Sequence, residues 1–178
     1  MRIFRSLTPI LLILLSVPIL HAQKSQRPTL TDAELEQIRE AGIDPPERIR
    51  LYTKFVDEHV ETLKGLIPRA HSSARVIRLD NELQDLTSLM DELGNNLDQY
   101  GDRKADLRKA LKPLTESSQR WLQVLNSLPT ESGFDLSRKE AIDSGKDLAD
   151  EAAQMLKDQT AYFELHKDQQ GQQRAEPQ

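Results

Sequence analysis

A regular alternation of apolar residues, three and four positions apart, constrains this chain more than any other feature. Residues with this spacing share one face of an α-helix, and a long unbroken series of them is typical of coiled-coil-like packing. The series consists of Val76, Leu79, Leu83, Leu86, Met90, Leu93, Leu97 and Tyr100. It predicts a long amphipathic helix whose apolar face must be covered by other helices.

Similar spacing recurs in three further segments, and no segment shows the strict alternation of a half-buried β-strand. The positions are Ile49, Tyr52, Val56, His59, Leu63 and Leu66; Leu107, Leu111, Leu114, Ser118, Trp121, Leu125 and Leu128; and Ala141, Gly145, Leu148, Ala152, Met155 and Tyr162. We therefore expect an all-α fold, an antiparallel up-down four-helix bundle with coiled-coil-like packing and a short N-terminal extra helix.

Capping signals predict the first helix boundaries. Thr31 and Glu34 form a capping box that opens the short extra helix, and Gly42 is placed to end it. Asp44 caps the next helix, with Pro45 at its first position, where the missing N–H group is not needed.

Later boundaries are predicted in the same way. Gly101 is expected to end the long helix, and Asp102 to start the following one as its close antiparallel neighbour. Pro113 predicts a kink near Ala110 or a break there. The last helix is expected to start at a second capping box, residues 137–140, after a loop at 130–135.

Pro68 leaves two topologies open. A kink there would join the neighbouring segments into one rod of roughly 80 Å, which only dimerisation would bury. We favour a turn, because residues 70–73 are small or polar and the apolar series changes register across them. Small residues every four positions, namely Ala141, Gly145, Ala149 and Ala153, allow a close helix approach, which we expect inside the bundle rather than between two copies.

The N-terminal segment has the order of a secretory signal peptide. Residues 1–22 begin with Arg2 and Arg5, continue with an apolar run over 10–20, and end at Ala22. The run is shorter than the about 20 residues of a membrane-spanning helix, so we expect cleavage after Ala22, with an uncleaved anchor as the alternative. We then expect a flexible leader at 23–30, the bundle at 31–166 and a disordered tail at 167–178.

Composition excludes several classes of function. The chain has no cysteine, which excludes thiolate metal sites and cysteine nucleophiles. It carries 24 basic and 29 acidic residues, and removing the N-terminal segment would make it more acidic still. We therefore expect an exported protein, periplasmic or extracellular, without nucleic acid as a partner and without a membrane span after cleavage.

Few residues suggest chemistry. His59 lies on an apolar face in the segment that also holds Tyr52, so the two are candidates for binding haem, a metal or a small ligand. The more ordinary interpretation is a boundary histidine with one hydrogen bond. No Glu-x-x-His or His-Glu-x-x-His motif is present, and Met90 and Met155 suit core packing better than haem ligation. We expect no cofactor and no metal.

A basic cluster is the other candidate. It consists of Arg103, Lys104, Arg108, Lys109 and Lys112. Bases at a helix start oppose the helix dipole, and Asp91, Glu92 and Asp98 oppose it at the end of the preceding helix. The two groups either neutralise each other across a hairpin, or the bases form a patch for an acidic partner.

These observations favour a non-enzymatic helical bundle that binds another protein or itself. No Gly-rich phosphate loop and no Gly-x-Ser-x-Gly motif is present, so an enzyme would need carboxylates that spacing alone does not reveal. A chaperone-like role is a variant of this hypothesis. The alternative is a carrier of a small ligand, haem or a metal that uses His59 and Tyr52.

Overall fold

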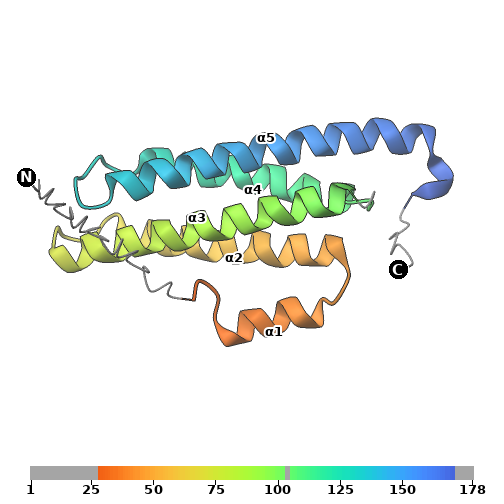
Figure 1. Ribbon diagram of the computed structural model, residues 1–178. Coiled ribbons are helices and arrows are strands. Elements are labelled where there is room, and N and C mark those ends of the chain that lie inside the picture. Colours follow the sequence, from red (N-terminus) through yellow and green to blue (C-terminus); the bar gives the residue numbers. More distant parts are fainter. Residues whose placement is uncertain (1–27, 103–104, 171–178) are drawn as a thin grey trace, which may run out of the picture.

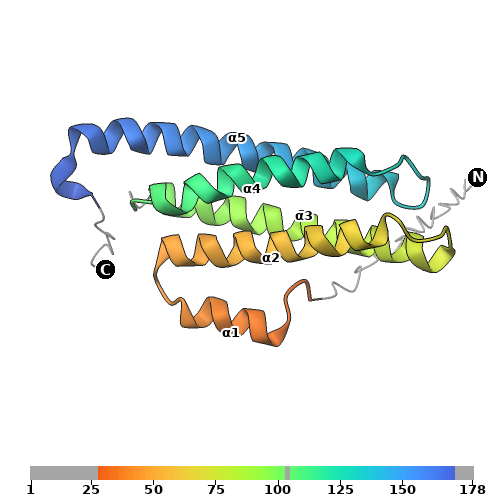
Figure 2. The ribbon, with the colours of Figure 1, turned by 180° about the vertical axis from the view of Figure 1, so that it is seen from behind.

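The computed structural model describes residues 28–102 and 105–170, and within these ranges the chain is all-helical, without strands. The helices are α1 (Asp32–Glu40), α2 (Pro45–Leu66), α3 (Ser73–Asp102), α4 (Arg108–Ser127) and α5 (Asp135–Leu165), followed by the short 3-10 helix η1 (Lys167–Gln169). The four long helices lie side by side, with α1 along the outside of α2 (Figures 1 and 2). The predicted all-α class is confirmed, and the packing is compatible with a bundle.

The apolar series on α3 forms the centre of the core. Seven of its eight positions are buried, namely Leu79, Leu83, Leu86, Met90, Leu93, Leu97 and Tyr100, while Val76 at the helix start packs against the core from a partly buried position. Burying each such side chain stabilises a fold by roughly 1.5–3 kcal/mol. Met90 is fully buried and Met155 packs against the core, as the sequence predicts for gap-filling methionines.

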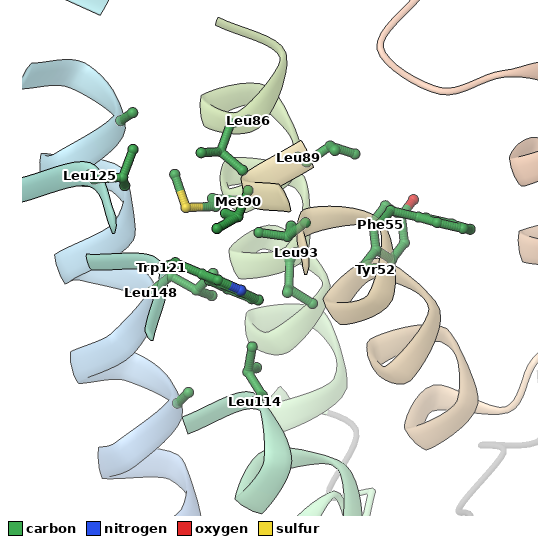
Figure 3. Packing of buried hydrophobic residues seen from close by; sticks show 14 of the residues in the cluster. Tyr52, Phe55, Leu86, Leu89, Met90, Leu93, Leu114, Trp121, Leu125 and Leu148 are labelled. Atoms are coloured by element: carbon green, nitrogen blue, oxygen red, sulfur yellow. The ribbon is translucent and has the colours of Figure 1, made fainter. Parts of the chain in front are cut away.

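Trp121 on α4 joins this core from the opposite side. It is 1% exposed, and Figure 3 shows its ring between Leu148 of α5 and Leu93 of α3. The indole N–H donates a hydrogen bond of 2.6 Å to Asp57 Oδ1 on α2. The ring is thus buried while its polar atom reaches a carboxylate at the rim of the core.

The order of neighbours differs from the prediction. Helix α3 packs against α2 and α5, and α4 also packs against α2 and α5, but α3 and α4 do not approach each other closely. The expectation that the short connection near Gly101 makes these helices neighbours is wrong. Five residues separate them, and a chain of that length spans up to about 17 Å, enough to cross between helices that are not in contact.

The boundaries between α3 and α4 also differ from the prediction. Helix α3 continues through Gly101 to Asp102, and α4 begins only at Arg108, so neither residue has its predicted capping role. A Cβ atom on Gly101 would lie 3.1 Å from Met155 Cε, so α5 lies close at this point. Pro113 lies inside a continuous α4, and the predicted break at Ala110 is absent.

The start of α4 is held by a side chain of α5 instead of a local cap. The N-cap residue Leu107 makes no side-chain capping bond, but its N–H donates to Gln159 Oε1 at 2.8 Å. Gln159 Nε2 donates in turn to the carbonyl of Ala105 at 2.9 Å. One amide group therefore satisfies a backbone donor and a backbone acceptor, which a local sequence signal does not reveal.

The signals at the first two helices are confirmed. Thr31 and Glu34 form the capping box of α1, and Gly42 follows that helix with a φ of 57°, a conformation that glycine adopts without strain. Asp44 caps α2, and Pro45 begins it. Leu30 differs from the prediction of a flexible leader, because it is 8% exposed and belongs to the core cluster.

The predicted second capping box does not cap α5. This helix begins at Asp135, two residues before Ser137, and has no side-chain cap. The hydroxyl group of Ser137 donates to Asp80 Oδ1 on α3 at 2.5 Å instead. Asp135 is paired with Arg138 and Lys139 in the first turn. The small-residue series on this helix is buried at Ala141, Gly145 and Ala149, which confirms the internal interpretation for these positions.

Pro68 lies in a turn between α2 and α3, as favoured above, and Arg75 closes this turn. Arg75 is 5% exposed, and its guanidinium donates to the carbonyls of Leu66 and Ile67 at the end of α2. It also pairs with Glu131 before α5, at 3.2 Å. Terminal helix carbonyls lack partners within their own helix, so one buried cation satisfies them and ties three segments together.

We expect Arg75→Met to lower the free energy of unfolding by roughly 3–5 kcal/mol, because it removes the buried guanidinium that binds Glu131 and two carbonyl groups. Urea denaturation would measure the loss. Arg78→Met, at an exposed position of the same helix, is the matched control and should change stability by less than about 0.5 kcal/mol. Equal losses in the two variants would contradict the role assigned to Arg75.

Gly133 allows a second test, of the close packing between the loop before α5 and the start of α3. A Cβ atom at this position would lie 2.1 Å from Val76 Cγ1, so Gly133→Ala should destabilise the fold by about 1–3 kcal/mol. Combining it with Val76→Ala should recover part of the loss. Thermal melts would measure these changes. Gly65→Ala, at a position where no atom lies within 4 Å of the added Cβ atom, is the control and should be neutral or stabilising.

Candidate functional site

His59 lies on α2 and faces α3. Its Nδ1 atom is 2.6 Å from Glu82 Oε1, and both side chains are 17% exposed. Burial lowers the pKa of this imidazole, but the hydrogen bond and charge of Glu82, with the charges of Asp85 and Glu34, outweigh burial and leave the pKa raised above its ordinary value. The protonated histidine therefore stabilises the contact between α2 and α3.

Tyr52 also faces α3, but it reaches a different carboxylate. Its ring is 2% exposed, and its hydroxyl group donates a hydrogen bond to Glu92. Burial, then the bond to Glu92, raises the pKa of this hydroxyl group above its ordinary range. Tyr52 and His59 are seven residues apart, about 10 Å along the helix axis, and the structure does not bring them into one site.

The basic cluster is described in part. Arg103 and Lys104 lie outside the described residues. Arg108 is bound by Asp106 through two hydrogen bonds, which raise the pKa of its guanidinium. Lys109 and Lys112 are exposed on the first turns of α4.

The acids at the end of α3 do not neutralise these lysines. Glu92 accepts the hydroxyl hydrogen of Tyr52, Asp91 accepts that of Ser144, and Asp98 faces Glu151 on α5. This follows from the helix order, because the backbones of α3 and α4 do not approach each other closely. The expected neutralisation across a hairpin is therefore wrong for these residues.

An aromatic hollow lies beside the basic cluster. It has a volume of about 300 Å³ and is lined by Gly101, Ala105, Asp158, Gln159, Tyr162 and Phe163. Arg108 connects it to the cluster, because its guanidinium lies 4.5 Å from the centre of the Phe163 ring, within the range of a cation–π contact. The hollow lies towards the end of α5 that extends beyond the other helices in Figure 1.

Sequence reasoning missed this hollow for a specific reason. Tyr162 was expected as an ordinary member of an apolar face, and Gln159 carries no signal of its own. They form a surface because Gly101 and Ala105 are small and because Gln159 holds the backbone at 105–107 against α5. His166 stacks on Tyr162 with ring centres 4.2 Å apart.

A second concave surface separates α3 from α5. This groove has a volume of about 400 Å³, and its charged lining residues are all acidic. The lining consists of Met90, Asp91, Gly94, Asn95, Asp98, Ser144, Asp147, Leu148 and Glu151. Burial first, and then the charge and hydrogen bond of Asp98, raise the pKa of Glu151 to about 7. Residue spacing does not reveal this pair, because its members are far apart in the chain.

Two kinds of feature are absent from the described residues. Between residues 28 and 170, apart from the gap at 103–104, no group of three His, Asp or Glu side chains has the arrangement of a metal site. Over the same ranges, no helix has the length and hydropathy needed to cross a membrane. Comparison with protein-family models, with curated proteins and with solved structures finds no match to this chain.

The His59–Glu82 pair predicts a pH dependence of stability. Because the folded-state pKa of His59 is raised, its contribution is complete below the ordinary pKa of 6.5 and is lost as the pH rises through the higher folded value. We expect Glu82→Gln to cost about 2 kcal/mol of unfolding free energy at pH 6 and clearly less at pH 9, measured in urea. Glu61→Gln, in an exposed ion pair, should show no such difference; a loss from Glu82→Gln that is the same at both pH values would contradict the assignment.

Proposed function

We propose that this chain is an exported, non-enzymatic helical bundle that acts by binding a protein partner, either another protein or a second copy of itself. The observation that supports it is the surface formed by the start of α4 and the end of α5. Here Lys109 and Lys112 are exposed beside an aromatic hollow, while His59 and Tyr52 are engaged by carboxylates of α3.

The chemistry of this surface defines the kind of partner. Exposed ammonium groups attract carboxylates, and a hollow lined by Tyr162 and Phe163 accepts an apolar side chain. A partner segment with acidic residues around one apolar anchor meets both requirements. Because the chain itself carries a net charge of −5, another copy is one possible source of such a segment.

We further propose that the four long helices form an up-down bundle with coiled-coil-like packing, in which consecutive helices run antiparallel while the neighbours α3 and α5 run in the same direction. The sequence of contacts along the two helices supports opposite directions for α2 and α3. Tyr52 binds Glu92, whereas His59, later on α2, binds Glu82, earlier on α3. On α5, Ser137 meets Asp80 and Ser144 meets Asp91, which supports a common direction for α3 and α5. Such a bundle presents the hollow and the basic cluster at one end.

Charge reversal tests the interaction surface. Lys109→Glu combined with Lys112→Glu should weaken self-association or partner capture at least roughly tenfold, because attraction at two exposed positions becomes repulsion. Sedimentation at increasing concentration measures the first, and retention of partners from the exported fraction measures the second. Lys54→Glu with Lys64→Glu reverses the same charge on exposed positions of α2 and serves as the control.

Three results would contradict the proposal. The first is a protein that stays monomeric at high concentration and retains nothing from the exported fraction. The second is an α2 control that weakens binding as much as the α4 variant. A mass spectrum of the native protein with haem, a metal or a lipid attached would instead favour the carrier alternative. A spectrum of the processed chain would also test the predicted cleavage after Ala22.

A further inference from the structure

Three polar contacts connect α3 to α5 along one side of the core, and the third differs from the other two. Ser137 and Ser144 each donate a hydroxyl hydrogen to an aspartate, Asp80 and Asp91 respectively. At the third contact, Glu151 and Asp98 line the same groove and interact with each other, so two carboxyl groups meet. Ionised carboxylates only accept hydrogen bonds, so this contact holds only when one of the two groups carries a proton.

The packing keeps the two carboxyl groups together. Gly94 on α3 leaves room for the Glu151 side chain, because a Cβ atom there would lie 3.4 Å from Glu151 Oε2. The Oε1 atom of Glu151 is buried without a hydrogen-bond partner. An ionised carboxylate with a buried, unpartnered oxygen is costly, whereas a protonated group is much less so.

Among the described residues, no cation lines the groove around this pair. The charged residues that line the groove are Asp91 and Asp98 on α3 and Asp147 and Glu151 on α5. The other elements packed against α5, namely α4 and η1, contribute none of the lining residues. The neighbours of the pair are therefore acidic, which opposes loss of the shared proton.

We propose that Asp98 and Glu151 form a proton-dependent latch between α3 and α5, closed when the pair shares a proton and loosened when the proton leaves. The raised pKa of Glu151, about 7, places the change near neutral pH. Above it, two negative charges face each other and separate the helices around residues 94–102 and 147–155. The serine contacts do not need a shared proton: Ser137 with Asp80 holds the other end of the seam, and Ser144 with Asp91 holds the near end of the groove. Only the part of the groove around Asp98 and Glu151 therefore widens.

The sign of the effect follows from proton binding. The folded protein binds a proton at Glu151 that the unfolded chain, with an ordinary pKa of 4.5, has already released. Stability therefore falls as the pH rises from about 4.5 to about 7, and the latch is open above that range. This inference is independent of the proposed protein partner, because it concerns only the contact between the two helices.

Hydrogen–deuterium exchange of the full chain at pH 5.5 and 8.5, corrected for the intrinsic exchange rate, tests the latch. Amides in 94–102 and 147–155 should exchange roughly tenfold faster at the higher pH, while those of α5 around Ser137, whose bond to Asp80 needs no shared proton, stay unchanged. Glu151→Gln and Asp98→Asn should each abolish this difference, because an amide group donates its hydrogen at both pH values. Asp147→Asn, in the same groove, is the control and should retain the difference.

A direct titration keeps the inference testable if one variant fails to fold. In the unmodified protein, the carboxyl carbon signal of Glu151 should titrate near pH 7 by NMR. A midpoint near the ordinary value of 4.5, an exchange difference that is absent in the unmodified protein, or one that persists in both amide variants would overturn the proposal.

Discussion

Burial of the apolar face of α3 is the constraint on which the rest of the structure depends. Residues from Leu79 to Tyr100 on this face are excluded from water along almost the whole helix, and no single partner helix covers so wide a face. Helices α2 and α5 therefore flank it on two sides. Once they do, α4 has only the opposite position left, where Trp121 fills the centre of the core (Figure 3).

Polar contacts at the rim of this core set the alignment of the helices. Apolar packing tolerates small shifts along a helix, whereas a hydrogen bond to a carboxylate does not. Trp121 with Asp57 aligns α4 against α2, and Ser137 with Asp80 aligns α5 against α3. Arg75 does the same for the turns at one end. These hydrogen-bonded side chains have a structural role. The exposed lysines of α4 and the Asp98–Glu151 contact do not align helices in this way, and to them we assign a further role.

Capping signals in the sequence predicted helix boundaries correctly where the capping residue binds within its own helical turn. The capping box at Thr31 and the cap at Asp44 need only residues within one turn, and both are present. The signals at Gly101 and Ser137 were local too, but α5 lies close to the glycine and Asp80 accepts the serine hydroxyl hydrogen. The same limit applies to His59: its bond to Glu82 agrees with the more ordinary of its two interpretations, but residue spacing does not identify Glu82 as the partner.

The sequence by itself determined that the chain is helical, which face of each helix is buried and that Pro68 separates two helices, because these properties depend on residues a few positions apart. Only the tertiary structure decided which helices are neighbours. Contacts such as Gln159 with Leu107, or Glu151 with Asp98, join residues about fifty positions apart in the chain. Periodicity within one helix contains no information about such pairs, since the same apolar face is buried equally well by several arrangements of neighbouring helices.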